Sequence, residues 1–377
     1  MLTRLNRLSR KHASKQTMAG NSIGSIFRVT TWGESHGPAI GAVIDGCPAG
    51  LRIDEAYIAR QLSRRRPGHS DLTSPRRETD ECAILSGVFE GYTTGTPISL
   101  YILNNNQRPG DYDALRDVYR PSHADYSYDA RYGRRDHRGG GRSSARETAA
   151  RVAAGAVAQL LLREMGVVLQ SYVTSIGPIR LDIPLEQLDP EAALHSPVGC
   201  PHPPTAQRMA ELIELVRAEG DSVGGTVRCL ARGVPAGWGD PVFDRLEADL
   251  GKAMLSVNAV KGVSFGAGFD AARGRGSEFN DAFVVSDGNL TTSTNHSGGI
   301  QGGISNGQDI VVDIAFKPVA SIARGQSTVD SQGNPVELVV KGRHDPCVVP
   351  RALPIVEAMA ALVLADHGLR RRSARLG

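Results

Sequence analysis

Aromatic residues are scarce in this chain of 377 residues, at 5% of the composition. Proteins that hold single-stranded nucleic acid without sequence preference stack bases on aromatic side chains, so this scarcity argues against that class. The formal net charge is only +3, which excludes a strong field over the whole surface. Since no run of about 18 apolar residues is present, the sequence predicts no membrane-spanning helix.

Cysteine is also sparse, with five residues spread along the chain. Their number is odd and no two are closely spaced, which argues against a disulfide framework or a zinc site. Histidines 69, 137 and 344 likewise lack the spacing of metal ligands. Unpaired cysteines are typical of a reducing compartment, so we expect a cytoplasmic protein. No Gly-x-Gly-x-x-Gly motif stands at a first strand–helix turn and no Walker motif occurs, which disfavours Rossmann and P-loop folds.

Residues 1–17 differ from the rest of the chain, because they are basic, polar and free of acidic side chains. We expect a disordered extension or a segment upstream of the true start at Met18, and a short transit peptide is the alternative. Residues 18–369 contain no clear linker and are expected to form a single domain. Residues 370–377 are expected to be a basic, solvated tail.

Strand and helix signals alternate without the strict spacing of parallel βαβ units. Hydrophobic patterns predict strands over Ile23–Thr31, Ala39–Asp45, Ala83–Phe89, Ile98–Leu103, Val223–Ala231 and Asp309–Phe316. Helices are predicted over Asp54–Ser63, Ala145–Met165, Ala206–Glu219, Val242–Val257 and Ala352–His367, the last ending at Gly368. The helix at 145–165 is apolar on nearly every face, so we expect it to be buried centrally.

The segment 134–147 is the most informative part of the sequence. It places several arginines, a histidine and three consecutive glycines in front of the predicted helix. Glycines let backbone N–H groups approach a ligand closely, and Ser144 with Glu147 forms a capping-box pattern that predicts a helix start. A glycine-rich loop that enters a helix N-terminus is a good anion site, so we expect a phosphorylated or multiply carboxylated ligand.

Two further segments carry histidines next to polar partners. The turn Gly33–Gly37 contains Ser35 and His36, and the polar stretch after Arg120 contains His123 two residues before Asp125. A histidine is suited to donate a proton at neutral pH, and a carboxylate such as Asp125 can hold its ring. The alternative is that both are ordinary surface-turn histidines.

Arginine clusters, a second glycine-rich loop and a charged segment complete the candidate groups. The clusters at 64–66 and 76–77 suit bidentate binding of carboxylate or phosphate; a solvated charge run and a nucleic-acid patch are the alternatives. The glycine-rich loop at 295–303 precedes a strand that ends at Lys317. In the segment 341–346, Asp345 is either a base or a helix-capping residue paired with an arginine.

Together these segments resemble the chorismate synthase family over nearly the whole chain, from Met18 to about Leu369. The motifs that carry the resemblance are Gly33–Gly37, Arg65–Gly68, Arg120–Asp125, Gly140–Thr148, Ser256–Gly262, Gly298–Gly303 and Gly342–Pro346. The resemblance implies an α+β fold, a β-α-β sandwich with central helices between antiparallel sheets. It also implies a single catalytic domain over residues 18–369 and a homotetramer.

The resemblance further implies a reaction, the 1,4-elimination of phosphate from 5-enolpyruvylshikimate 3-phosphate to give chorismate. The reaction uses reduced FMN without net redox change, and NADPH is a candidate reductant. No nucleic-acid or membrane partner is implied. Two rivals are an ordinary flavin or NADPH oxidoreductase, which transfers electrons at every turnover, and an RNA-binding protein with steeply salt-dependent affinity.

By motif match, the resemblance also assigns roles to residues. The catalytic candidates are Ser35, His36, His123 and Asp345. The cofactor-binding candidates are Arg142, Ser143, Ser144, Asn258, Ala259, Gly302, Lys317, Pro318, Val319, Ala320, Ser321 and Arg343. The substrate-binding candidates are Arg65, Arg66, Arg120 and Arg146. Two departures are Asp71, where many relatives have a basic residue, and Val319–Ser321, where relatives often carry more hydroxyls.

Overall fold

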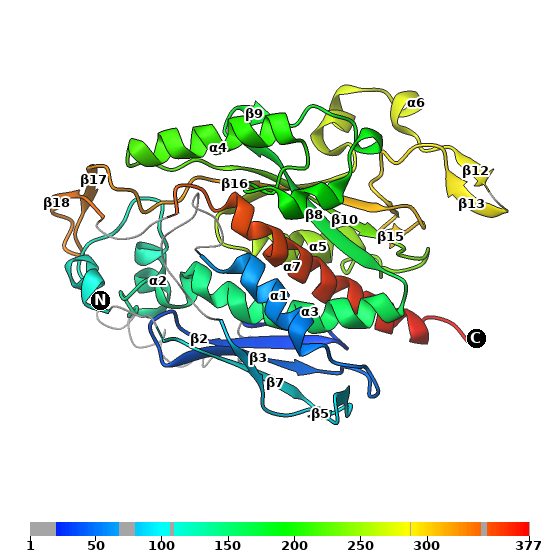
Figure 1. Ribbon diagram of the computed structural model, residues 1–377, viewed down its shortest axis with the longest axis horizontal. Helices are drawn as coiled ribbons and strands as arrows, with labels where there is room; N and C mark the ends of the chain where they lie inside the picture. The colour runs from blue at the N-terminus through cyan, green and yellow to red at the C-terminus, as the bar shows by residue number, and fades with distance from the viewer. Residues whose placement is uncertain (1–19, 68–79, 106–108, 287, 341–344, 377) are drawn as a thin grey trace, which may run out of the picture.

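Two antiparallel sheets enclose a layer of helices (Figure 1). The structure is a computed structural model that describes residues 20–67, 80–105, 109–286, 288–340 and 345–376. Helices α1, α3, α5 and α7 form the middle layer, and α4 lies on the outer side of the second sheet (Figure 1). The arrangement confirms the expected α+β sandwich. Residues 1–19 lie outside the described residues, so the expectation for the extension at 1–17 stays a prediction.

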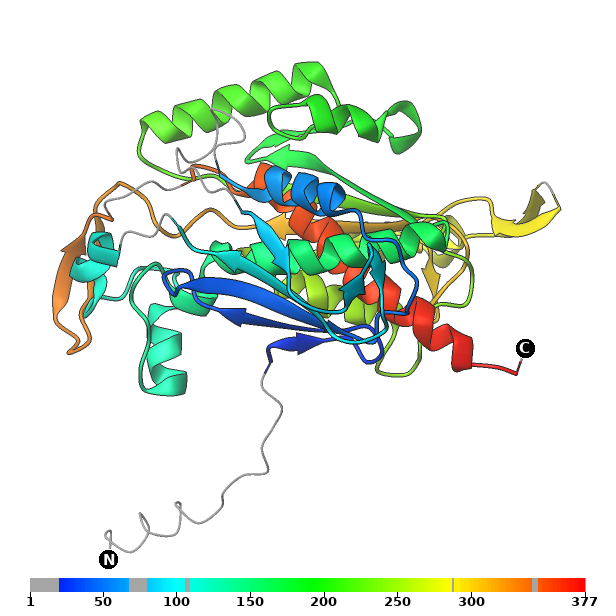
Figure 2. The same ribbon diagram turned by 60° about the horizontal axis from the view of Figure 1, so that its bottom comes forward.

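The strands follow a simple order in each sheet. The first sheet runs β1 (Ser22–Ile23), β2 (Arg28–Gly33), β3 (Ala39–Asp45), β7 (Ile98–Leu103) and β4 (Cys82–Ile84). The second runs β11 (Val260–Phe265), β16 (Ile310–Phe316), β10 (Gly225–Arg232), β8 (Val168–Ile176) and β9 (Ile179–Arg180). Four hairpins stand apart: β5 (Val88–Phe89) with β6 (Tyr92–Thr93), β12 (Phe283–Ser286) with β13 (Asn289–Thr292), β14 (Ile300–Gln301) with β15 (Ile304–Ser305), and β17 (Gln326–Val329) with β18 (Pro335–Leu338). Two of them, β12–β13 and β17–β18, project from opposite ends of the molecule (Figure 2).

The described residues contain seven α-helices, of which five lie where the sequence predicts a helix, although not at every boundary, while α2 and α6 were not predicted. They are α1 (Glu55–Arg65), α2 (Asp125–Tyr132), α3 (Thr148–Glu164), α4 (Pro203–Ala218), α5 (Leu246–Leu255), α6 (Gly276–Phe279) and α7 (Val349–Arg370). Short 3-10 turns η2 (Pro109–Leu115), η3 (Gly141–Ser143) and η4 (Ala145–Glu147) precede α2 and α3. Asp54 caps α1 by accepting a hydrogen bond from the Tyr57 N–H at 2.8 Å, as its position in the sequence predicts.

The central helix α3 is buried on nearly all sides, which confirms the expectation from its composition. Its residues are buried except at Arg151, Leu160, Arg163 and Glu164. It packs against β3 and β7 on one side and against α7 on the other, while α7 packs against β8 and β10. The capping-box prediction is only half right: Ser144 accepts from the Arg146 N–H, but the Glu147 side chain bonds Thr31 and Arg151 instead of returning to Ser144.

The strand predicted over Ile23–Thr31 is broken in the middle. Gly24 has a positive φ of 87°, and the backbone N–H groups of residues 25, 26 and 27 all donate to one carboxylate oxygen of Asp366, at 2.9, 2.6 and 2.9 Å. Those donors are therefore not available to a neighbouring strand. The strand predicted over Ala83–Phe89 is likewise divided, at Gly87 with its φ of 79°.

Two predicted helix boundaries are wrong for tertiary reasons. The helix predicted from Val242 begins at Leu246, because Asp240 and Asp244 form a backbone bridge and both accept hydrogen bonds from Arg370. Helix α7 runs through Gly368 instead of ending there. A Cβ on Gly368 would lie 2.8 Å from the Trp238 ring, so this glycine serves close packing and not helix termination.

Among the described residues, helix α7 with its 3-10 extension to Ser373 is long and apolar enough to cross a membrane. The sequence pattern did not lead us to expect such a helix. Its apolar window is 100% buried inside the fold. Burial on all sides is typical of a core helix that is apolar all round.

Replacing Gly155 in α3 by alanine is expected to destabilise the fold by about 1–3 kcal/mol, because an added Cβ would lie 2.3 Å from the Cβ of Ala358 in α7. In an unobstructed helix the same change stabilises by up to about 1 kcal/mol. Gly251 in α5 has open space around its Cβ position, so Gly251→Ala is the matched control. Urea unfolding measures both, and a Gly155→Ala variant as stable as the parent would contradict this close helix contact.

Candidate functional site

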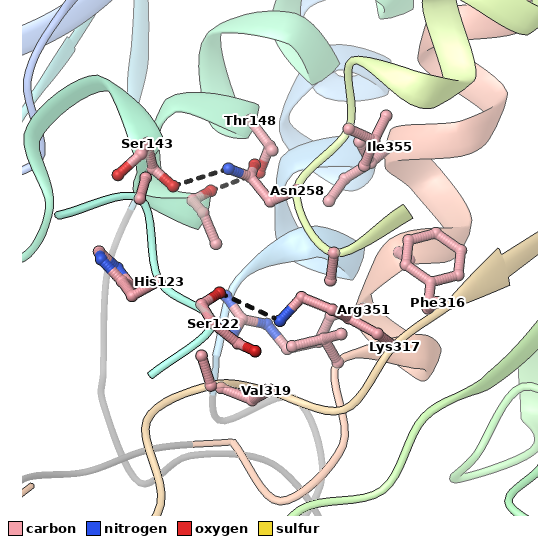
Figure 3. A pocket seen from close by; sticks show the side chains of 17 residues that line it. Ser122, His123, Ser143, Thr148, Asn258, Phe316, Lys317, Val319, Arg351 and Ile355 are labelled. Atoms are coloured by element: carbon pink, nitrogen blue, oxygen red, sulfur yellow. Dashed lines mark hydrogen bonds between the residues drawn. The ribbon is translucent and has the colours of Figure 1, made fainter. Parts of the chain in front are cut away.

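A cavity of about 300 Å³ opens at one end of the central helices (Figure 3). This volume lies at the lower end of the range for small-molecule sites. Its lining comes from five segments of the chain: residues Ser122, His123 and Ala124; Ser143, Ala145 and Thr148; Val257, Asn258 and Ala259; Phe316, Lys317, Val319 and Ala320; and Val348, Arg351, Ala352 and Ile355. The sandwich therefore brings together groups that are far apart in the sequence.

The N-terminal turns of two central helices contribute to this lining. Thr148 is the first residue of α3, and Arg351 and Ala352 lie in the first turn of α7. Helix N-termini carry unsatisfied N–H groups and a partial positive charge. Two such termini beside one cavity favour an anionic ligand, in agreement with the anion site expected at the glycine-rich loop.

The turn between α5 and β11 closes one wall of the cavity. The Asn258 side-chain amide donates to the Ser143 carbonyl oxygen at 2.7 Å, and the Lys317 N–H donates to the Ala259 carbonyl oxygen at 2.9 Å. Ala259 has a positive φ of 67°, a left-handed conformation in which its carbonyl can face Lys317. Six of the expected cofactor-binding positions line the cavity: Ser143, Asn258, Ala259, Lys317, Val319 and Ala320.

Lys317 places an ammonium group at the cavity (Figure 3). Its Nζ lies 3.4 Å from the Ser122 carbonyl oxygen. Burial, with a smaller effect from Lys261, holds the pKa of Lys317 below its ordinary value. Both causes disfavour the charged form, so an anion bound beside Lys317 would restore favourable charge pairing.

His123 lies at the cavity wall and is held by a shared carboxylate. Its Nδ1 lies 2.9 Å from Asp125, and the same carboxylate accepts two hydrogen bonds of 2.8 Å from Arg120 and lies 3.0 Å from Arg135. Burial lowers the pKa of His123, the nearby arginines lower it further, and contact with Asp125 opposes both. The net effect holds that pKa below its ordinary value, so the imidazole is neutral near pH 7.

The neighbours of Asp125 favour its ionised form. Burial by itself would raise the pKa of Asp125, but hydrogen bonds from Arg120 and contact with His123 outweigh it and hold that pKa far below its usual range. The neighbouring carboxylate expected for His123 is therefore confirmed. Arg120 is buried and engaged by this carboxylate, and it does not line the cavity.

His36 lies on the other side of the glycine run from His123. A Cβ on Gly139 would lie 2.2 Å from the His36 ring, and a Cβ on Gly140 would lie 3.1 Å from the His123 ring. Both glycines have positive φ values, 63° and 91°. Only glycine allows the backbone to pass this closely between two imidazoles.

The His36 ring has neighbours on two further sides. Its Nδ1 lies 3.1 Å from the Ser35 hydroxyl, and its ring packs edge-on against Tyr112 with centroids 4.9 Å apart. Tyr112 belongs to a small apolar cluster with Leu115, Leu338 and Val340. Neither Ser35 nor His36 lines the cavity, so the site has two parts that meet at the glycine run.

Arginines expected to bind substrate contact a buried carboxylate instead of the cavity. Arg65 donates to Asp80 at 2.6 Å, and Arg146 donates to the other oxygen of Asp80. Burial alone would raise the pKa of Asp80, but the two guanidinium groups outweigh it and hold that pKa below its usual value. Arg66 lies beyond the last residue of α1, as its C-cap, and does not line the cavity.

Several expected cofactor positions lie outside the cavity lining. Arg142 points toward β2, where it donates to the hydroxyl and carbonyl of Thr31 and to the Gly33 carbonyl. Gly302 is exposed in the β14–β15 turn. The remaining positions that do not line the cavity are Ser144, Pro318 and Ser321. Arg343 and Asp71 lie outside the described residues, so the expectations about them stay predictions.

The cavity also has a cation that the sequence pattern does not single out. Arg351 lines the cavity, donates to the Arg65 carbonyl at 3.0 Å and forms an ion pair with Asp345. Asp345 therefore lies next to a residue of the cavity wall. Pairing with an arginine was one of the two interpretations of Asp345 from the sequence, and the structure shows such a pair. The available signal was an arginine that follows Pro350 at the start of a mostly apolar helix.

Comparison with known proteins identifies the family. The family model for chorismate synthase matches residues 27–369. The chain is 57% identical to a chorismate synthase of Opitutus terrae, over 95% of this chain and 98% of that protein. It is 56% identical to one of Christiangramia forsetii, over 95% of this chain and 100% of that protein.

A solved structure gives the same result for the fold. A crystal structure of chorismate synthase superposes with a TM-score of 0.75 at 34% identity, covering 93% of this chain and 94% of that one. The segment matched by the family model, residues 27–369, contains every residue that lines the cavity. The chain belongs to the chorismate synthase family.

Proposed function

We propose that this protein converts 5-enolpyruvylshikimate 3-phosphate to chorismate by 1,4-elimination of phosphate, with reduced FMN as cofactor. The observation that carries the proposal is the cavity where Ser143, Asn258, Ala259 and Lys317 meet beside His123. Ser143, Asn258, Ala259 and His123 lie in three separate segments that match motifs of the family, and Lys317 directly follows the strand β16. The cations and the two helix N-termini suit a ligand set that carries phosphate and carboxylate groups.

The lining residues fit a flavin. Apolar side chains of Val257, Phe316 and Ile355 suit a flat ring system, while Lys317 and the N-terminus of α3 suit its phosphate. We propose that Ser143, Asn258, Ala259 and Lys317 hold the cofactor. When bound, reduced FMN supplies electron density to the reacting centre.

The chemistry balances without an external oxidant. The C–O bond to phosphate and a ring C–H bond break, the C–H electron pair becomes part of the new diene, and the proton and phosphate leave. Charge that develops on the departing phosphate needs fixed counter-charges in a site that excludes water. We propose that His36 protonates or steadies the leaving phosphate and that Lys317 and Arg351 neutralise anionic groups at the cavity.

Two other groups, Asp345 and His123, are assigned to proton transfer. The Asp345 carboxylate assists removal of the ring proton, and its ion pair with Arg351 holds it beside the cavity. His123, whose imidazole is neutral near pH 7, would keep the flavin in its reactive protonation state. Ser35 supports His36 through the contact between their side chains. Binding of substrate by Arg65, Arg66, Arg120 and Arg146 stays a prediction.

An anaerobic assay tests the function. Protein, reduced FMN and 5-enolpyruvylshikimate 3-phosphate are mixed, and chorismate and phosphate are followed together. We expect equal amounts of both products over many turnovers while the flavin remains reduced. Flavin oxidation in proportion to turnover would instead favour the oxidoreductase alternative. A second reaction in air with oxidised FMN and NADPH tests whether the protein reduces its own flavin.

We also propose that the protein is a cytoplasmic homotetramer. Size-exclusion chromatography tests the number of subunits.

A further inference from the structure

The turn that carries His36 is held by a residue from a neighbouring strand. β3 pairs with β7 in a register that sets Ala39 opposite Leu103. Asn104, the residue that follows β7, therefore falls beside the turn, and its backbone N–H donates to the Pro38 carbonyl at 3.1 Å. Because proline has no N–H to donate back to Asn104, the backbone hydrogen bonds between the two strands end here. The next contacts come from the Asn104 side chain.

The Asn104 side-chain amide spans the turn from one end to the other. Its Nδ2 donates to the Glu34 carbonyl at 3.0 Å and to the Gly37 carbonyl at 2.8 Å. The turn itself is closed by the Gly37 N–H, which donates to the Glu34 carbonyl at 3.1 Å. One planar group thus holds both flanks of the Ser35–His36 pair.

The orientation of this amide is determined by Arg146. The Arg146 Nε donates to the Asn104 Oδ1 at 2.8 Å. A guanidinium can only donate, so the amide oxygen must face Arg146 and the NH₂ group must face the two carbonyls. Arg146 is in turn fixed by its ion pair with buried Asp80.

Other contacts to the turn are longer. The Ser35 N–H donates to the Gly141 carbonyl at 3.4 Å, and the Ser35 hydroxyl donates to the Arg138 carbonyl at 3.4 Å. Hydrogen bonds weaken beyond about 3.2 Å. The two bonds from Asn104, at 3.0 and 2.8 Å, therefore restrain the path of the turn more strongly than these two contacts of Ser35 do.

We propose that Asn104 is a positioning residue for His36. Its side-chain amide fixes the orientation of the imidazole by donating hydrogen bonds to the two carbonyl groups on either side of the histidine. The inference deepens the proposed function, because it rests on the assignment of His36 to the departing phosphate. Asn104 does not line the cavity. Its effect is expected through the placement of the imidazole, since a displacement of about 1 Å can cost roughly 100-fold in rate.

Asn104→Asp isolates this effect. The carboxylate still accepts from Arg146 but donates nothing to Glu34 or Gly37, and its oxygen faces their carbonyls. Turnover at saturating substrate is expected to fall about 10- to 100-fold with a smaller change in KM. Asn105→Asp is the matched control, since it adds the same charge at the exposed adjacent position, and it is expected to behave like the parent.

A double-mutant cycle with His36→Ala decides whether the effect passes through the histidine. In the His36→Ala background, Asn104→Asp is expected to cause no further loss, because there is no imidazole left to aim. Parent-like turnover of Asn104→Asp overturns the inference, and so does an equal loss in both backgrounds. Asn104→Ala removes the donors without adding charge and enters the same cycle if Asn104→Asp does not fold.

A measurement without substrate separates this inference from the proposed function. The His36 ring signals are followed by NMR in ligand-free parent, Asn104→Ala and Asn104→Asp proteins across pH. The inference expects shifted His36 signals in both variants and unchanged signals in Asn105→Asp. Unchanged His36 signals in the Asn104 variants overturn it. If the parent makes no chorismate, the proposed function fails, while the NMR result still decides whether Asn104 positions His36.

Discussion

Replacing His123 by alanine is expected to lower chorismate formation at saturating substrate roughly 100-fold or more, the range for loss of a positioned proton-transfer group. The imidazole lies at the cavity wall and is oriented by Asp125 at 2.9 Å. Alanine removes the ring but leaves the pairing of Asp125 with Arg120, so the fold should survive. Initial rates in the anaerobic assay and thermal unfolding of the same samples measure the two effects.

His195→Ala provides the control, because His195 is exposed in a 3-10 turn and lies outside the cavity lining. The pH dependence adds a second readout. Burial, more than the adjacent arginines, holds the pKa of His123 below its ordinary value, so turnover that needs the neutral ring should stay level near pH 7 and fall on the acid side. Full activity of His123→Ala at neutral pH would remove the role assigned to this residue.

The same pKa direction has a consequence for folding stability. In the unfolded chain His123 takes up a proton at its ordinary pKa, whereas in the folded protein it does so only at lower pH. The unfolded state therefore binds more protons as the pH falls through that interval, and the folded state loses stability there. In His123→Ala this part of the acid sensitivity should disappear.

Replacing Asp366 by alanine is expected to destabilise the protein by roughly 3–5 kcal/mol, a large share of the 5–15 kcal/mol typical of a domain. Asp366 in α7 is 3% exposed and accepts hydrogen bonds from three consecutive backbone N–H groups at residues 25–27. Alanine leaves these donors without their charged acceptor. It also frees the segment that joins β1 to β2.

Denaturant unfolding measures this loss through the shift of the midpoint at constant slope. Asp270→Ala is the matched control, because it removes an exposed carboxylate whose 3.0 Å ion pair with Arg273 lies at the surface, and such pairs contribute little. A midpoint for Asp366→Ala equal to that of Asp270→Ala would show that the three hydrogen bonds do not anchor the N-terminal strands.

Local signals in the sequence were enough for the elements that depend on neighbours along the chain. The strands Ala39–Asp45 and Ile98–Leu103 have the predicted bounds. The first is a short, almost continuous run of buried small and apolar residues, and the second alternates between buried and partly exposed residues, and both patterns can be recognised from residue type alone. The Asp54 cap and the contact of His123 with Asp125 were also predictable, since the partners are only two or three residues apart.

Long-range partners were not predictable in the same way. Pattern alone marks Gly368 as a helix end, yet Trp238 packs against it and the helix continues. The same limit applies to Arg65 and Arg146: their arginine-rich motifs suggest anion binding, and nothing in the sequence indicates that both guanidinium groups also pair with Asp80. A sequence shows that a charge is present and does not show which opposite charge the fold will bring to it.

The sequence by itself determined the family, the α+β class and the residues with chemical potential, because each follows from residue types in a fixed order along the chain. Only the tertiary structure decided which of those residues share a cavity, that Arg351 joins them, and that Asn104 spans the His36 turn. The physical reason is strand register and helix packing. Both are set by the whole buried core. They bring together side chains that are far apart along the chain, and nothing in the sequence indicates that these side chains are in contact.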